Sequence, residues 1–322
     1  MQVNDSSNQG RSKEDIARLF RAAYGQEPDF VAATPGRVNL IGEHTDYNDG
    51  WVLPMTLDAE VYVALRKRGD KVLNMVSVDF GEKTSWDLQH LETRPSRSWD
   101  SYIASVYRAL QNEGYHVTGA DLLVVGDIPQ GAGLSSSAAL ELCVARAACA
   151  AGGWQWDPVP MALLGQEAES HFMGVHCGVM DQMAVAACEP GCALLIDCRK
   201  LKLESIAINL KDAIFVVVDS GVKRELKNSA YNDRREECEK AYAELQKIDP
   251  GLNCLSDATL TVLKKAGDPS EVWFRRARHV LTENARVRKA VEALKSGDAP
   301  AFGALMTQSH ESLRQDFEVS SR

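Results

Sequence analysis

The sequence predicts an α+β fold, and two observations on the order of its patterns support this. Apolar runs with the length of strands dominate the first part of the chain, whereas long charged helices dominate the second part. Strands and helices therefore do not alternate as in a regular α/β protein. With 322 residues, of which 45% are hydrophobic, the chain can bury a sizeable core in one large or two medium domains.

We expect three parts along the chain. Residues 1–12 are polar and are expected to form a disordered tail. An N-terminal domain is expected over residues 13–205 and a C-terminal domain over residues 206–322, with a soft boundary near residue 205. That boundary falls between two apolar runs, 192–198 and 214–219, which both predict buried strands.

Local patterns predict the other elements. Residues 13–24 predict an amphipathic helix because Ile16, Leu19, Phe20 and Ala23 share one helical face. The other predicted helices are 99–113, a helix that ends at Gly152-Gly153, 159–172, 179–187, 229–248 and 272–294. The other predicted strands are 30–41, which is broken at Pro35-Gly36, 51–65, which follows a turn at Asn48-Asp49-Gly50, 72–80 and 120–125.

Composition excludes several classes of protein. Lysine and arginine number 36 and aspartate and glutamate 45, so the net charge of −9 disfavours a general binder of nucleic acids or anionic membranes. No apolar stretch approaches the roughly 18 residues of a membrane span, and the N-terminus lacks the apolar core of a signal peptide. The eight cysteines are scattered without a CxxC pair, which indicates free thiols in a reducing cytoplasm. We expect a cytoplasmic monomer.

The segment Gly126-Asp-Ile-Pro-Gln-Gly-Ala-Gly-Leu-Ser-Ser-Ser137 links a predicted strand to a predicted helix. A glycine loop before a helix start favours phosphate binding, because its backbone N–H groups and the helix dipole face the ligand. An ordinary turn with one serine N-cap is the simpler interpretation, although a single cap needs only one hydroxyl. The GxGxxG and P-loop motifs both fail here, and the loop has no lysine or arginine. Backbone N–H groups and a metal ion would therefore have to balance a polyphosphate.

Glu43, His44 and Asp46 crowd into the segment Thr34-Pro-Gly-Arg-Val-Asn-Leu-Ile-Gly-Glu-His-Thr-Asp46. Carboxylates accept hydrogen bonds from neighbouring hydroxyls and an imidazole can donate or accept, so the cluster suits a small polyol. A polar loop with capping carboxylates explains the same residues. One histidine beside two acids is weak evidence for zinc.

Single charged residues elsewhere have two interpretations each. Arg37 suits either an ion pair or the stabilisation of a transferring phosphoryl group. Asp181, in an otherwise apolar run after Gly178, is either an acid at a helix N-terminus or a group that deprotonates a substrate hydroxyl. Glu169 is either a solvated helix residue or a Mg²⁺ ligand. Tyr231 either packs in a helix or bonds a substrate hydroxyl.

Four segments in this order resemble the galactokinases of the GHMP small-molecule kinase superfamily. They are Arg37-Val-Asn-Leu-Ile-Gly-Glu-His-Thr-Asp46, Gly131-Ala-Gly-Leu-Ser-Ser-Ser-Ala138, Gly178-Val-Met-Asp-Gln182 and Tyr231-Asn-Asp-Arg-Arg235. The resemblance extends from about residue 15 to about residue 319. It implies a two-domain GHMP kinase architecture, with an N-terminal ribosomal-protein-S5-like domain that has a mixed sheet and a C-terminal α/β sandwich domain.

The resemblance also implies an activity, which is the ATP-dependent phosphorylation of α-D-galactose at its anomeric hydroxyl. By similarity, Asp181 and Arg37 are the expected catalytic residues. The expected sugar-binding residues are Glu43, His44, Asp46, Gly178 and Tyr231. The expected ATP-binding residues are Ser77, Gly131, Ala132, Gly133, Leu134, Ser135, Ser136 and Ser137. Ser137 and Glu169 are the expected Mg²⁺ ligands. A kinase for a related sugar such as N-acetylgalactosamine, and a non-catalytic sensor of galactose and ATP, are the alternatives.

The last residues depart from the family pattern. Members carry a third, glycine-rich motif near their C-terminus, but no glycine follows Gly303 here. We therefore expect a C-terminally shortened member with an incomplete second domain, an exposed apolar edge and lower stability. Weak or absent catalysis is part of the same expectation.

Overall fold

The computed structural model describes residues 11–91, 98–174, 177–211, 213–219 and 228–320. Its internal contacts divide the chain into two compact units that interleave along the sequence. Unit 1 comprises Met1–Gly36, Leu57–Gln130 and Leu134–Gly174, and unit 2 comprises Arg37–Thr56, Gly131–Gly133 and Val175–Arg322. The predicted domain boundary near residue 205 stays a prediction. Of the predicted tail at residues 1–12, residues 1–10 lie outside the described residues, whereas Arg11 pairs with Asp127 and Ser12 caps the first helix.

Unit 1 begins with helix α1 (Lys13–Tyr24), as predicted. The Ser12 hydroxyl accepts from the Asp15 N–H at 3.2 Å, while the Asp15 carboxylate accepts from the Ser12 N–H at 3.1 Å, so a reciprocal capping box fixes the helix start. Ile16 and Phe20 are fully buried against Tyr62 and Leu123 of the sheet. The amphipathic pattern of residues 13–24 therefore corresponds to real packing.

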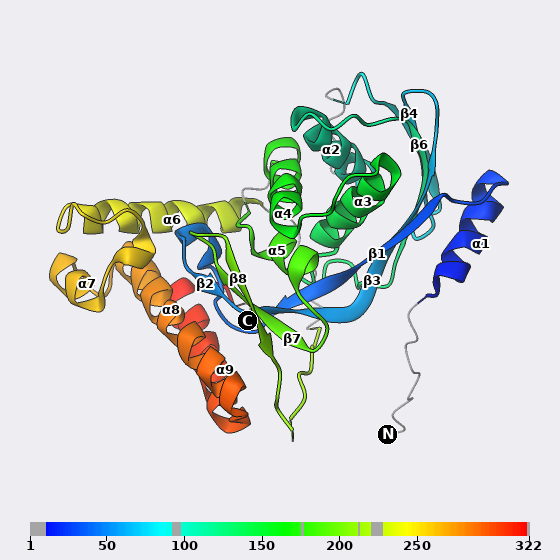
Figure 1. Ribbon diagram of the computed structural model, residues 1–322. Coiled ribbons are helices and arrows are strands. Elements are labelled where there is room, and N and C mark those ends of the chain that lie inside the picture. The colour runs from blue at the N-terminus through cyan, green and yellow to red at the C-terminus, as the bar shows by residue number, and fades with distance from the viewer. Residues whose placement is uncertain (1–10, 92–97, 175–176, 212, 220–227, 321–322) are drawn as a thin grey trace. The chain divides into compact units, whose positions relative to one another are not determined.

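The unit 1 sheet is mixed. Strands β3 (Pro54–Lys67), β6 (Ala120–Gly126), β4 (Val72–Ser77) and β5 (Glu82–Asp87) follow one another in this order, and β1 (Phe30–Asn39) pairs with β3. The β3–β6 and β4–β5 pairs are antiparallel, whereas β4 and β6 are parallel. Helix α1 lies on one face of this sheet, and α2 (Trp99–Asn112) and α3 (Ser136–Gly152) lie on the other face (Figure 1). Strands β1 and β3 also contribute residues to unit 2.

Helix α3 follows the glycine loop, as the sequence predicts. It begins after Ser135, which has a left-handed backbone with φ 55°, and it ends at Gly153 with φ 69°. Its first residues place backbone N–H groups and hydroxyls at one helix end. Helix α4 (Pro158–Glu167) then continues into a π-helical turn over Ala168–Phe172 that carries Glu169.

Unit 2 contains short antiparallel strands and most of the long helices. Strand β7 (Cys192–Asp197) pairs with β2 (Trp51–Val52) on one side and β8 (Lys202–Ala207) on the other. The unit 2 helices are α5 (Met180–Ala187), α6 (Asn228–Gln246), α7 (Leu260–Ala266), α8 (Val272–Ser296) and α9 (Ala299–Ser312). Short turns cover Asp46–Asn48, Leu255–Asp257 and Leu313–Phe317.

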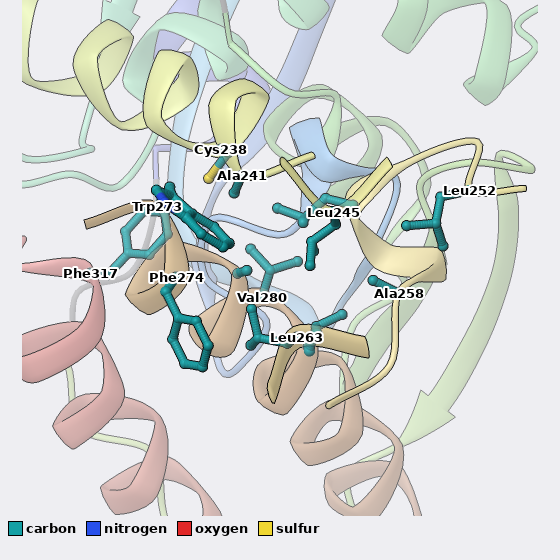
Figure 2. Packing of buried hydrophobic residues seen from close by; sticks show 13 residues of the cluster. Cys238, Ala241, Leu245, Leu252, Ala258, Leu263, Trp273, Phe274, Val280 and Phe317 are labelled. Atoms are coloured by element: carbon teal, nitrogen blue, oxygen red, sulfur yellow. The ribbon is translucent and has the colours of Figure 1, made fainter. Parts of the chain in front are cut away.

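Helix α8 lies at the centre of unit 2. Figure 2 shows Trp273, Phe274 and Val280 of α8 packed among residues of α6 and α7. Farther along α8, Val287 and Leu294 are fully buried in a second cluster that includes Ile41. One long helix thus joins two apolar cores, because its buried positions recur at helical spacing over 25 residues.

Two predictions about strands are wrong. Residues 214–219 form no strand, and Ile214 and Val218 are 85% and 81% exposed. An apolar run favours a strand only where a neighbouring strand pairs with it, and pairing is a non-local event. Strand β1 also continues through Pro35-Gly36 without a break. Among the described residues β3 is the strand that pairs with β1, so the missing N–H of Pro35 is tolerated at the edge of the sheet.

Two features bear on the expectations from composition. All eight cysteines, each within the described residues, are free thiols, and five of them are buried. In the part of the chain that the structure covers, no helix has both the length and the apolar character to cross a membrane.

Candidate functional site

Arg37 and Asp181 form a bidentate ion pair within unit 2. The Arg37 Nε–H donates to Asp181 Oδ1 at 2.8 Å, and its Nη2 donates to Asp181 Oδ2 at 2.6 Å. The Arg37 Nη1 donates to the carbonyl oxygen of Gly133 at 2.9 Å. Burial lowers the pKa of the guanidinium, but Asp181, followed by Glu43 and Asp46, more than offsets this, and the net shift is upward. The apolar run around Asp181 thus carries a paired acid.

Residues 42–50, named here the acidic loop, leave β1 and return to β2. His44 and Asp49 have left-handed backbones with φ 60° and 57°, and the Gly50 N–H donates to the Thr45 carbonyl oxygen at 2.9 Å. Gly42, with φ 101°, has no room for a side chain, because a Cβ atom would lie 2.6 Å from the Trp51 carbonyl oxygen. The acidic loop is therefore a tight turn that requires glycine at position 42.

The acidic loop concentrates carboxyl groups in partly buried surroundings. Burial raises the pKa of Glu43 to about 7; Arg37 opposes this shift, whereas Glu283 and other nearby acids add to it. Burial and then Asp181 raise the pKa of Asp46 to about 6, against hydrogen bonds from backbone N–H groups. Both acids hold their protons more tightly than usual, so keeping them charged in this part of unit 2 costs free energy that a ligand with hydrogen-bond donors can offset.

Aromatic rings from distant segments adjoin the acidic loop. The Tyr231 ring centroid lies 5.8 Å from that of His44 and 5.4 Å from that of Tyr47. The His44 Nδ1 lies 2.9 Å from the Tyr47 hydroxyl, and the His44 ring packs tilted against Phe317 with the ring centroids 4.6 Å apart. The Tyr231 hydroxyl oxygen accepts from the Gly178 N–H at 3.4 Å. These residues come together from four separate parts of the sequence.

Gly178 lies directly against Asp46. A Cβ atom at position 178 would be 1.7 Å from Asp46 Oδ2, which is far inside contact distance. The close approach of this backbone explains why glycine is needed beside the carboxylate. Gly178, Asp46, Glu43, His44 and Tyr231, which are the predicted sugar-binding residues, thus gather in unit 2.

A cavity of about 430 Å³ opens beside these residues. It is lined by Arg37, Val38, Asn39, Glu43, His44, Gly131, Ala132, Gly133, Met180, Val218, Asp219, Leu313, Val319 and Ser320. The volume is suitable for a small ligand, and charged side chains and glycine backbone share the lining. Residues from the predicted catalytic, sugar-binding and ATP-binding sets therefore line one cavity of unit 2.

Unit 1 contains the remaining predicted positions. The Ser137 hydroxyl, in the first turn of α3, donates to Glu169 Oε1 at 3.0 Å, and the Glu169 side chain is buried. A hydroxyl and a carboxylate are hard oxygen donors of the kind that Mg²⁺ uses together with phosphate oxygens. Among the described residues no group of three or more His, Cys, Asp and Glu side chains could hold a metal. Ser77 is buried at the end of β4, and its hydroxyl oxygen accepts from the Phe80 N–H at 3.4 Å.

Several residues of the site were missed from the sequence. Tyr47 and Phe317 contact His44, and the α8 residues His279, Glu283 and Asn284 bond the backbone of the acidic loop or of Trp51. The α8 residues lie on a helix that the sequence marks only as long and charged. Tyr47 alone had a local signal, because it lies inside the acidic cluster.

Comparisons with known proteins agree with this geometry. A model of the galactokinase galactose-binding signature matches residues 18–67, and a model of the GHMP kinases N terminal domain matches residues 101–189. The galactokinase of Roseiflexus sp. (strain RS-1) is 42% identical over 307 residues, covering 95% of this chain and 78% of the relative. The galactokinase of Chloroflexus aggregans is 44% identical with the same coverage.

Solved structures support the same relationship. The Lactococcus lactis galactokinase in complex with galactose has a TM-score of 0.85 and 31% identity, and the match covers 96% of this chain and 81% of that one. The Methanococcus jannaschii mevalonate kinase matches with a TM-score of 0.58 and 18% identity over 91% of this chain and 80% of that one, which shows the fold alone. The GHMP kinase fold expected from the sequence is confirmed.

The raised pKa of Glu43 predicts a pH-dependent stability. The folded state binds this proton more tightly than the unfolded state, so the acid destabilises the fold increasingly as pH rises from about 4.5 to 7. Glu43→Gln removes this penalty, and its stability relative to the natural protein should rise by about 2 kcal/mol between pH 5 and pH 8. Urea unfolding at both pH values measures this difference. Glu14→Gln, at an exposed position, is the control; parallel pH curves for Glu43→Gln would contradict the prediction.

The close approach at Gly178 predicts that Gly178→Ala destabilises unit 2. The new Cβ forces the Asp46 carboxylate out of its place, at a cost of about 1–3 kcal/mol. Thermal unfolding should show a lower midpoint. The matched control is Gly303→Ala in α9, where nothing lies within 4 Å of the new Cβ, and which should leave the midpoint unchanged or raise it slightly. Equal midpoints for the two variants would refute the clash.

Proposed function

This chain belongs to the galactokinase family, and from that premise we propose that it transfers the γ-phosphoryl group of ATP to the anomeric hydroxyl of α-D-galactose. The products are galactose 1-phosphate and ADP. The observation that carries the proposal is the bidentate Arg37–Asp181 pair, of which Arg37 lines a cavity together with Glu43 and His44. This arrangement places a cation for a phosphoryl group and an acceptor for a hydroxyl side by side.

Glu43, His44, Asp46, Gly178 and Tyr231 hold the sugar in this proposal. The Glu43 and Asp46 carboxylates accept hydrogen bonds from neighbouring hydroxyls, and the His44 ring stacks on Phe317, which holds its direction. Burial keeps the pKa of Tyr231 well above its usual range, so its hydroxyl stays neutral and can donate. A sugar that satisfies buried carboxylates is preferred strongly over an analogue that leaves them unpaired.

Asp181 and Arg37 perform the chemical step. The anomeric oxygen attacks the γ-phosphorus while Asp181 accepts the proton of that hydroxyl. The bond between the γ-phosphorus and the oxygen bridging to the β-phosphate breaks, and ADP leaves with the bonding electrons. Arg37 neutralises charge on the phosphoryl oxygens while the phosphoryl group passes from the bridging oxygen of ATP to the anomeric oxygen of the sugar. The existing ion pair holds both side chains in place before substrate arrives, so little reorganisation is needed.

The loop from Gly131 to Ser137 binds the ATP phosphates in this proposal, with Ser77 near the nucleotide. The loop carries no basic side chain, so backbone N–H groups and the α3 N-terminus bind the phosphates. Arg37 supplies a positive charge that the loop lacks, because its guanidinium bonds the Gly133 carbonyl oxygen.

Ser137 and Glu169 hold Mg²⁺ in the same proposal. Their oxygens already lie 3.0 Å apart, and this donor set leaves positions for phosphate oxygens and water. When bound, the ion neutralises phosphate charge.

The eight free cysteines lead us to propose a cytoplasmic location, and we propose that the protein acts as a monomer.

A coupled assay of ADP release over a panel of sugars tests the function. Turnover with galactose is expected. Turnover only with another sugar, such as N-acetylgalactosamine, would reassign the substrate. Binding of galactose and ATP without turnover would instead indicate a sensor. The relatives that cover most of this chain are named galactokinases, which favours galactose.

Asp181→Asn should lower kcat by roughly 10²–10⁴-fold, because an amide cannot accept the proton of the attacking hydroxyl. Galactose binding, measured by titration calorimetry, should remain within a few-fold of the natural protein. Asp58→Asn removes the same charge at an exposed position and serves as the control. Full turnover by Asp181→Asn would remove this residue from the mechanism.

Glu169→Gln should raise the Mg²⁺ concentration needed for half-maximal activity by roughly tenfold or more, because the ion loses a carboxylate. Excess Mg²⁺ should recover much of the rate. Glu167→Gln, two residues earlier at the end of α4, tests for a general effect of charge on this helix. An unchanged Mg²⁺ requirement in Glu169→Gln would exclude the residue as a ligand.

A further inference from the structure

We propose that His279 and Glu283 of helix α8 are positioning residues that fix the backbone of the acidic loop and thereby aim Glu43 and His44 at the sugar. The inference rests on the proposed function, since it assigns these two side chains to the sugar site described above. Neither residue lines the cavity, so both act through the loop.

Glu283 holds the start of the acidic loop. Its Oε1 accepts from the Gly42 N–H at 2.9 Å and from the Ser309 hydroxyl at 2.6 Å, and its Oε2 accepts from Arg286 Nε at 2.6 Å. The Glu283 side chain is fully buried. A buried carboxylate with three donors is a fixed point, because losing any donor leaves a desolvated charge less satisfied.

His279 holds the peptide group between Glu43 and His44. Its Nε2 lies 2.9 Å from the Glu43 carbonyl oxygen, and its Nδ1 lies 2.9 Å from the Ser312 hydroxyl. A carbonyl oxygen only accepts, so Nε2 carries the hydrogen. Burial lowers the pKa of His279 below its usual range, which is consistent with a neutral ring. The Ser312 hydroxyl beside Nδ1 also donates to Asp316 Oδ2 at 3.3 Å.

The two contacts come from one face of α8, because residues 279 and 283 are separated by one helical turn. Together they hold the Gly42 N–H and the Glu43 C=O, which lie on either side of one peptide bond. Gly42 is already confined by its φ of 101° and by the Trp51 carbonyl oxygen. The bonds therefore fix the direction in which the Glu43 side chain leaves the backbone.

The same helix holds the far end of the acidic loop. Asn284 Oδ1 accepts from the Trp51 N–H at 2.8 Å, and its Nδ2 donates to the Ser256 hydroxyl at 3.0 Å. The Ser256 hydroxyl donates in turn to the Asn48 carbonyl oxygen at 2.6 Å. With both ends held from α8, the loop keeps its shape as a unit rather than one residue at a time.

This arrangement separates sugar binding from phosphoryl transfer. The sugar-binding residues Glu43 and His44 depend on α8 for their backbone, whereas Arg37 and Asp181 come from β1 and α5. Loosening the loop should weaken binding of galactose and leave ATP binding almost unchanged. A residue with a merely structural role would instead lower stability and active fraction without changing either KM.

His279→Leu removes the donor, and His279→Gln restores an amide N–H near the Nε2 position. We expect His279→Leu to raise the KM and the calorimetric Kd for galactose about tenfold or more, with the KM for ATP within twofold. His279→Gln should recover part of this loss. Ser312→Ala removes the partner of Nδ1 and, with it, a 3.3 Å hydrogen bond to Asp316 Oδ2. It is the milder second variant and should raise the galactose KM a few-fold. Ser312→Ala provides the test of the inference if His279→Leu does not fold.

Leu263→Ala in α7 is the control for stability. Leu263 is buried in the apolar core to which α8 also contributes, so its truncation creates a cavity there. It should lower the melting temperature and leave both KM values unchanged. The inference is overturned if His279→Leu and Ser312→Ala behave like Leu263→Ala, or if they raise the KM for galactose and ATP equally. Failure of the proposed function is distinct, because the natural protein itself would then show no galactose-dependent ADP release.

Discussion

The Arg37–Asp181 ion pair is the interaction on which the site depends. Glu43 and Asp46 lie where burial disfavours a charged carboxyl, and both interact electrostatically with Arg37, as Asp181 does. Without the bidentate bonds of Arg37, unit 2 would contain a cluster of unbalanced acids. The same guanidinium also bonds the Gly133 carbonyl oxygen. One side chain therefore connects Asp181, the proposed proton acceptor, to the backbone of the glycine loop.

A second constraint is that the acidic loop has little structure of its own. It is a tight turn with left-handed residues at His44 and Asp49, and such turns are stable only where the surroundings determine them. Helix α8 provides these surroundings, because its apolar face packs into two cores while its polar side chains reach the loop backbone. This is the usual division between a rigid scaffold and a functional loop. The sequence of α8 looks like that of a charged surface helix, but several of its polar side chains are buried and bond the backbone of the acidic loop.

The buried position of the Asp46 carboxylate explains both its raised pKa and the need for glycine at position 178. Gly178 must lack a side chain because the Asp46 carboxylate occupies that space, and Asp46 is held there although its pKa is raised to about 6. Proteins maintain such costly arrangements where a ligand compensates for them. The hydroxyls of a sugar, which can donate to both carboxylates, provide that compensation in the proposed function.

Local sequence patterns were sufficient to predict the elements whose start, end and buried face depend on neighbouring residues. The helix at 13–24, the strand at 120–125 and the helix after the glycine loop follow from spacing, caps and glycines, and the resemblance identified the family. Strand pairing was not predictable in the same way. The apolar run at 214–219 is exposed, and β5 and β8 were missed although they pair along their full length. The bonds that join Arg37 to Asp181 span 144 residues, and those from α8 to Gly42 span 241. Neighbouring residues determine where a helix or strand forms, so the sequence alone could predict these elements. The partner of a buried charge depends on which distant segments the folded chain brings together, so only the tertiary structure determines it.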